Sequence, residues 1–205
     1  MRQIDRIFNS MVGKGNTEPY TLYDYLESTE TDKQWIDTGL PADENTVFNF
    51  KFYINKHAVQ TYIGYADDSI GFQLYQYNRQ YFISYGTQQY LKIAQSEKPE
   101  NNWTEVTLGK NSRMDFYDGT SATLTFNDET FTTSGNVYLF ALSGTKQNYF
   151  RDLRLSEIKR YDSGVLTQDF QPKLRNSDGV AGMHEVVNDV FYPSANGVNF
   201  LYGNF

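Results

Sequence analysis

The sequence predicts an all-β protein, an antiparallel two-sheet jelly-roll sandwich preceded by a short N-terminal segment. After Pro19 the apolar residues recur at every second position, and "TVFNFKFYI" at 46–54 sets Phe48, Phe50 and Phe52 against polar neighbours. That period is typical of strands with one buried face. Turn signals separate roughly ten to twelve such runs, a number and spacing that favour a sandwich. Aromatic residues make up 17% of the 205 residues, which indicates a chain with a substantial core.

Residues 1–19 follow a different pattern, and we predict a helical or extended attachment segment there, separate from the domain at 20–205. Its apolar residues are spaced i, i+3, i+4 and i+7, as on one face of a short helix. They are Ile4, Ile7, Phe8 and Met11. A helix this short needs a surface to pack on, either its own domain or a partner.

The stretch "YLESTETDKQWIDTGL" at 25–40 combines a polar run with a large indole. We expect Tyr25 and Leu26 to anchor a first strand, and the polar run to be a surface excursion. Trp35 then returns as a core side chain where the chain crosses between sheets. The other interpretation is an exposed Trp35 that stacks on a ligand.

Further strands are expected in order along the chain. The stretch 61–86 predicts strands around the turns "ADDS" and "YNRQ", and 89–95 adds another. Residues 103–126 predict three strands, because Asp118-Gly119 is a strong hairpin signal. The apolar run "NVYLFALSG" at 136–144 predicts a central strand, and 151–175 predicts two strands around "YDSG".

The composition excludes several classes of protein. Lys plus Arg number 18 and Asp plus Glu 25, a net charge of −7, which argues against binding nucleic acid. There is no Cys, so disulfides and thiolate metal sites are excluded. No apolar stretch is long enough to span a membrane, and the N-terminus does not resemble a signal peptide.

Several motifs resemble the concanavalin A-like, laminin-G-type jelly rolls of bacteriophages and prophages. The opening 25–40 is similar to their "Y-I/L-E-S-T-G-T-Q-Y-I-D-T-G", although Glu30, Lys33 and Trp35 depart from it. The segments "WTEVTLGKNSRMDFYDG", "IKRYDSGVLTQDFQP" and "RNSDGVAG" are similar to later parts of that pattern. The resemblance covers about residues 20–200. It implies a jelly-roll fold and a place in tail, fibre or baseplate proteins, with many different partners.

No catalytic or cofactor site is predicted. Paired acids in the spacing of glycoside hydrolases are missing. His57 and His184 are far apart in the sequence, and we expect structural roles for both. A structural calcium ion would need oxygens from loop residues, but no spacing signature supports one. The residues considered for it are Asp67, Asp68, Asn127 and Asp128.

Sugar binding is the best positive hypothesis, because sugar rings stack on aromatic side chains while amides and charged groups bind their hydroxyls. Within 62–90 aromatic and planar polar residues are concentrated. Alternation in 72–77 sets Phe72 and Leu74 on one face and Tyr75 and Tyr77 on the other. The candidate carbohydrate-binding residues are Tyr65, Tyr75, Tyr77, Arg79, Tyr85 and Gln88. Two alternatives remain open, a tyrosine-rich strand surface without a ligand and a subunit contact.

We therefore expect a non-enzymatic bacteriophage virion component, such as a head or tail fibre or a baseplate decoration. The segment at 1–19 would anchor it to virion proteins or sister chains, and a homotrimer is expected by analogy with fibres. The jelly roll would contact a host-surface or environmental glycan. The first alternative is a purely structural protein that bridges virion subunits, and the second is a depolymerase.

Overall fold

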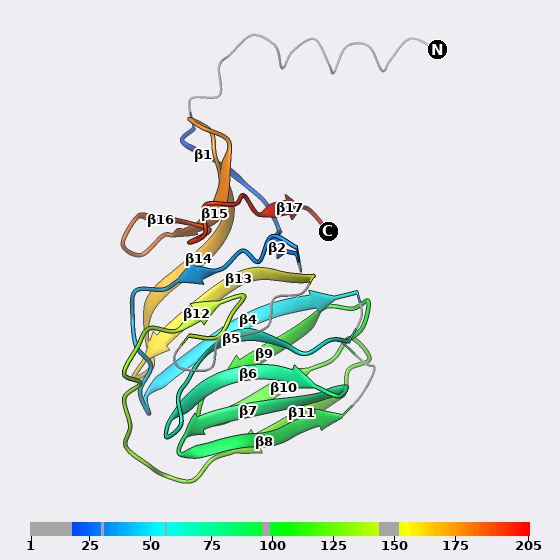
Figure 1. Ribbon diagram of the computed structural model, residues 1–205, viewed down its shortest axis with the longest axis vertical. Coiled ribbons are helices and arrows are strands. Elements are labelled where there is room, and N and C mark those ends of the chain that lie inside the picture. Colours follow the sequence, from blue (N-terminus) through cyan, green and yellow to red (C-terminus); the bar gives the residue numbers. More distant parts are fainter. Residues whose placement is uncertain (1–17, 30, 56, 96–98, 144–151) are drawn as a thin grey trace.

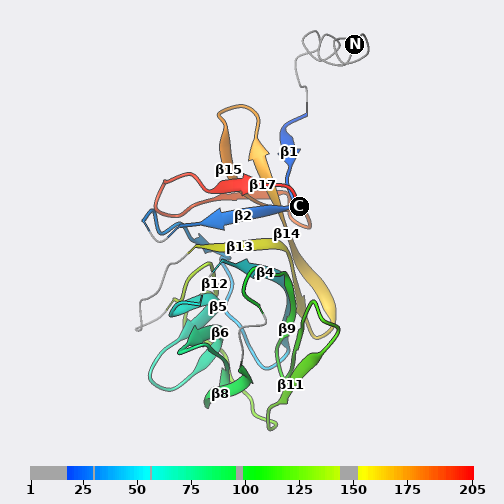
Figure 2. The ribbon, with the colours of Figure 1, turned by 90° about the vertical axis from the view of Figure 1, so that its right-hand side faces the viewer.

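The computed structural model describes residues 18–29, 31–55, 57–95, 99–143 and 152–205. Within these ranges the chain forms strands only, so they contain no helix that could cross a membrane. All strands of the two sheets pair antiparallel, which confirms the predicted all-β, two-sheet class. Figure 2 shows the two layers edge-on, with β5, β6 and β8 in one layer and β4, β9 and β11 in the other.

The large sheet has the strand order β11-β10-β9-β4-β13-β14-β15-β16, and β1, β2 and β17 pair alongside it. The first five strands of that order are β11 (Ser121–Thr125), β10 (Asn111–Asp115), β9 (Thr104–Leu108), β4 (Thr46–Ile54) and β13 (Leu153–Asp162). The others are β14 (Val165–Arg175), β15 (Val180–Glu185), β16 (Val190–Pro193), β1 (Tyr20–Leu22), β2 (Tyr25–Ser28) and β17 (Leu201–Gly203).

The small sheet has the order β3-β12-β5-β6-β7-β8. Its strands are β3 (Ile36–Asp37), β12 (Tyr138–Leu139), β5 (Gln60–Ala66), β6 (Gly71–Tyr77), β7 (Gln80–Gly86) and β8 (Gln88–Gln95). The β6–β7 hairpin turns through Asn78 and Arg79, both with positive φ, 49° and 59°. Two successive residues of this kind match the right-handed twist of the strands they join.

The core lies between the sheets and is rich in aromatic rings. Strand β4 alternates as predicted, with Phe48, Phe50 and Phe52 buried and Asn49 and Lys51 exposed. The rings of Phe48 and Phe72 lie 6.0 Å apart, and those of Phe52 and Tyr62 lie 4.4 Å apart, so that each pair joins the two sheets. Burial of these rings is the main stabilising contribution to such a sandwich.

Two local predictions need correction. The predicted strand in the run 136–144 does lie inside the small sheet, between β3 and β5, but in the described part of that run it is only two residues long. Phe140 has a φ of 65°, which a strand cannot continue through. Trp35 is half-buried rather than a core side chain, and its ring stacks on Tyr138 at 4.3 Å. The neighbouring Ile36 takes the core position instead.

The molecule is elongated, and its two ends differ. In Figure 1 the strands β1, β14 and β15 extend beyond the layers at one end, while β7, β8 and β11 lie at the other. Because β1 begins at Tyr20, the N-terminal segment enters at the first end. The attachment residues predicted there, Ile4, Ile7, Phe8 and Met11, lie outside the described residues, so that prediction stays untested.

Candidate functional site

A cluster of aromatic rings lies on the outer face of the small sheet. The rings of Tyr75 and Phe82, directly opposite each other on β6 and β7, stack at 5.2 Å. The ring of Tyr90 on β8 meets Tyr75 edge-on at 5.6 Å. Tyr77, two residues beyond Tyr75, is 50% exposed and Tyr90 is 40% exposed. We call these four residues the aromatic platform.

The platform rests on a buried polar pair in the next row of the sheet. Gln73 Nε2 donates to Ser84 Oγ at 3.2 Å, and the backbone N–H of Tyr90 donates to the same oxygen at 3.1 Å. Tyr90 has a φ of 62°, and the pairing of β7 with β8 shifts register nearby. Such a bulge redirects a side chain, and here the Tyr90 ring meets Tyr75. Burial, with the adjacent Tyr90, raises the pKa of Tyr75, so its phenol stays neutral.

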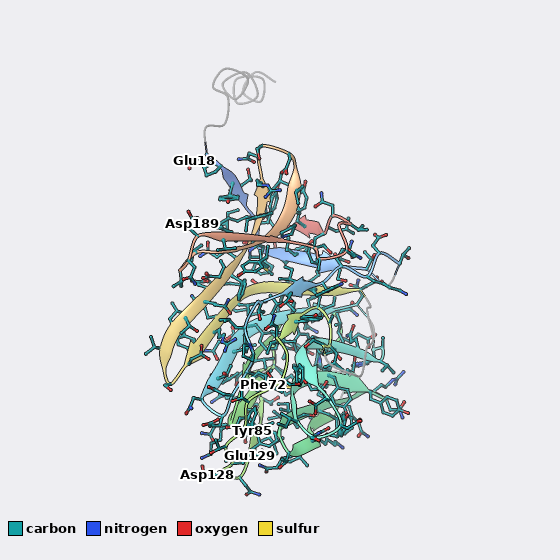
Figure 3. All side chains as sticks on the ribbon, turned by 60° about the vertical axis from the view of Figure 1, so that its left-hand side comes forward. Glu18, Phe72, Tyr85, Asp128, Glu129 and Asp189 are labelled. Atoms are coloured by element: carbon teal, nitrogen blue, oxygen red, sulfur yellow. The ribbon has the colours of Figure 1, made fainter. Side chains whose placement is uncertain are left out.

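Two of the predicted sugar-binding residues are unsuitable, because they face the core side of the sheet. Tyr65 pairs with Phe72, and Phe72 pairs with Tyr85, so the three form one inward row across β5, β6 and β7. Tyr85 is 1% exposed, its hydroxyl donates to the Glu44 carbonyl at 2.7 Å, and burial raises its pKa to about 12. Figure 3 shows Tyr85 and Phe72 within the lower half of the molecule.

The last two predicted residues lie at or beside the ends of strands, Arg79 in the β6–β7 turn and Gln88 at the start of β8. Arg79 is exposed in the β6–β7 turn, at the rim of the platform beside Tyr77. Gln88 instead lies at a corner of the molecule, where it links β8 to the segment that follows β11. Its Nε2 donates to Glu129 Oε1 at 3.2 Å, and its Oε1 accepts from the Asn127 N–H at 3.0 Å. This corner lies at the end of the molecule opposite Glu18 (Figure 3).

The Glu129 carboxylate closes that corner. It accepts the backbone N–H of Thr87 at 3.1 Å and the Thr87 hydroxyl at 2.6 Å. Burial alone would raise the pKa of Glu129, but these hydrogen bonds, with that from Gln88, hold it below its usual value. Of the six predicted residues, the structure thus brings together Tyr75, Tyr77 and Arg79.

Both histidines have structural partners. His57 lies beside a buried polar network in the core, where Gln76 Nε2 donates to His57 Nδ1 and to the Tyr81 hydroxyl. His184 lies in the large sheet, where Nε2 contacts Asp189 Oδ1 at 2.7 Å and its ring stacks on Tyr20 at 4.4 Å. His57 lies in the segment between β4 and β5, whereas His184 lies on β15, and the two form no common site.

The calcium candidates are engaged in local contacts. Asp67 Oδ1 accepts the N–H groups of Ser69 and Ile70 at 2.8 Å, and its Oδ2 accepts the Tyr65 hydroxyl at 2.7 Å. Asp128 pairs with Lys110. Among the residues that the structure describes, no three His, Cys, Asp or Glu side chains are grouped as metal ligands.

Phe82, Tyr90 and Lys92 are site residues that were not among the candidates predicted from the sequence. Phe82 lies opposite Tyr75 on one side and opposite Lys92 on the other. The turn sequence "YNRQ" could have indicated the contact between Tyr75 and Phe82, because a two-residue turn fixes which residues of a hairpin lie opposite each other. The contact with β8 depends on a bulge, which has no comparable sequence signal.

Comparisons with known proteins add no family. No family model matches the chain, and the search of curated proteins found no match either.

Proposed function

We propose that this chain is a non-enzymatic bacteriophage virion component that binds a host-surface or environmental glycan through the aromatic platform. The virion assignment rests on the sequence motifs at 25–40, 103–119, 158–172 and 175–182 and on the jelly-roll fold that they imply. The glycan assignment rests on the platform, where sugar rings would stack on Tyr77 and Tyr90. Many weak sites displayed on one particle would act together as a strong one.

The observation that carries the proposal is the combination of open rings with polar groups at their rim. Tyr75 and Phe82 form a fixed base, and the more exposed Tyr77 and Tyr90 flank it. Sugar C–H faces pack on such rings. Lys92, opposite Phe82, and Arg79, in the turn, add hydrogen-bond donors for hydroxyl groups.

The arrangement of the ends fits display on a particle. The chain enters the domain through β1, at the opposite end from β7 and β8 (Figure 1). An attachment segment at 1–19 would hold the first end at virion proteins or sister chains, as in a homotrimeric fibre, and leave the platform facing outward.

A glycan array with the full chain tests this function. We expect binding to at least one surface polysaccharide of the host, and a loss of roughly tenfold in affinity for Tyr77→Ala, the effect of one stacking contact. Tyr117→Ala is the matched control, because Tyr117 is 64% exposed in the turn before β11. It should bind as the unchanged chain does.

The alternative functions predict other outcomes. A purely structural protein that bridges virion subunits would bind no glycan on an array that includes the host's own polysaccharide. In that case Tyr77→Ala would weaken particle assembly instead. Release of reducing ends from host capsule would indicate a depolymerase and would overturn the non-enzymatic assignment.

A further inference from the structure

The outer face of the large sheet carries an open groove of about 470 Å³. Its floor consists of outward-facing residues at alternate positions of β4, β9 and β13. They are Asn49, Lys51, Glu105, Thr107, Glu157 and Lys159. The volume is within the range of about 300 to 1,000 Å³ that is usual for small-molecule sites.

A bulge in β13 gives the groove its irregular floor. Leu155 pairs with Phe52 and Ile158 with Phe50, so Ser156 and Glu157 together lie opposite the single residue Lys51. An inserted residue bends its strand and turns a side chain out of the regular alternation, and bulges of this kind are frequent next to functional sites. Both Ser156 and Glu157 line the groove.

The groove is lined by charged groups that neutralise one another. Lys51 Nζ contacts Glu105 Oε1 at 2.7 Å, and Lys159 Nζ contacts Glu157 Oε2 at 3.1 Å. The remaining acidic side chain of the lining, Asp115, pairs with Arg113 at 2.6 Å. Each charged side chain of the lining thus has a partner of opposite sign. Such a lining offers many donors and acceptors and favours neither an anion nor a cation.

One end of the groove is an exposed phenyl ring on a fixed aromatic base. Phe205 is 73% exposed, and its ring meets Trp103 edge-on at 4.8 Å. Trp103 lies 5.7 Å from the ring of Tyr53. The Arg154 guanidinium lies over the rings of both Tyr53 and Tyr25, at 4.9 and 4.8 Å.

This aromatic base is held by polar contacts as well as by ring packing. Arg154 Nε donates to Glu27 Oε2 at 2.7 Å, and the Phe205 N–H donates to Asp24 Oδ2 at 2.9 Å. The ring of Phe205 is therefore positioned before any ligand arrives, which lowers the entropy cost of binding.

We infer that this groove is a second saccharide site, on the opposite sheet from the platform, and that it takes a neutral, hydroxyl-rich sugar chain. One sugar ring stacks on Phe205. The next ring lies over Lys51 and Glu105, with its hydroxyls bound by these side chains and by Asn49 and Thr107. The inference extends the proposed glycan-binding function to a different face, so the two can fail separately.

The chain has two tryptophans, and they report on the two sheets separately. Trp103 contacts Phe205 at the groove, whereas Trp35 stacks on Tyr138 beside the small sheet. A proton–nitrogen NMR spectrum of the full chain gives one indole N–H signal for each, assigned with Trp35→Phe. The probes are neutral oligosaccharides of glucose, galactose, mannose or N-acetylhexosamine, together with their sulfated and uronic acid counterparts.

We expect a neutral oligosaccharide to shift the Trp103 signal in a saturable way and to leave the Trp35 signal in place. Phe205→Ala should weaken this binding roughly tenfold, as expected for one stacking contact. Tyr77→Ala, which removes an exposed ring from the other sheet, should leave the Trp103 titration unchanged.

Other results separate this inference from the proposed function. If Tyr77→Ala abolishes binding and the Trp103 signal does not move, the groove is not a saccharide site, and the proposal for the platform stands. Binding that only Phe205→Ala weakens supports the groove and refutes the platform. If the Trp103 site prefers the sulfated or uronic acid probes, the inference that its ligand is neutral is wrong. If no probe binds at all, both proposed sites are refuted.

Discussion

Replacement of Phe52 by Ala tests whether the two sheets are stacked as described. Phe52 is fully buried on β4, and its ring lies 4.4 Å from Tyr62 and 5.9 Å from Tyr81 on the facing sheet. Truncation of such a ring costs about 3–5 kcal/mol, from lost burial and from the cavity left behind. For a domain of this size each kcal/mol lowers the melting temperature by about 2–4 °C. We therefore expect a decrease of roughly 6–20 °C.

Lys51→Ala is the matched control, because the adjacent side chain points to the opposite face. The side chain of Lys51 is 48% exposed, and that of its ion-pair partner Glu105 is 61% exposed. Exposed pairs of this kind contribute about 0.2–1 kcal/mol. Urea denaturation of both variants measures the difference. If Phe52→Ala lowers the free energy of unfolding by less than about 1 kcal/mol, or if Lys51→Ala lowers it equally, β4 does not place Phe52 in the core and Lys51 at the surface, and the described core is refuted.

Two further substitutions test buried polar groups. Gln76→Leu removes the acceptor of the Tyr62 hydroxyl at 3.3 Å and the donor to Tyr81 at 3.2 Å. Because buried groups then lose partners, urea denaturation should show a cost of about 2 kcal/mol or more, and a change below about 0.5 kcal/mol would contradict the network. Burial and the nearby Glu157 raise the pKa of Asp169 above its usual 3.8, so ionisation destabilises the folded state as pH rises through that window. Asp169→Asn should raise the melting temperature near pH 7 and have a smaller effect near pH 3, whereas equal effects at both would be inconsistent with this reasoning.

The strand pattern was predictable because it depends on local alternation. The three phenylalanines of β4, Phe48, Phe50 and Phe52, were assigned correctly to the core. The two turns that join β5 to β6 and β6 to β7 were also predicted at the right positions. Period two alone cannot show where a strand stops. The early end of β12 depends on the positive φ of Phe140, and nothing in "NVYLFALSG" indicates that conformation.

The candidate site was predictable only in part. Alternation placed Tyr75 and Tyr77 outward correctly, but Tyr65 and Tyr85 were included for their residue type although they share the inward phase of Phe72. The groove on the large sheet could not be foreseen, because Lys51, Glu105 and Glu157 come from three strands far apart in the sequence. Their meeting depends on sheet order and on the bulge in β13.

The most direct test of the account is to map a bound glycan on the backbone amide signals of the full chain. The polysaccharide selected on the array would be shortened to a soluble oligosaccharide and titrated into the labelled protein. We expect saturable shifts that centre on 75–77 of β6, 80–82 of β7 and 90–92 of β8, with β11 and β14 unaffected. Saturable shifts confined to other strands, or no shifts with a glycan that binds on the array, would contradict it.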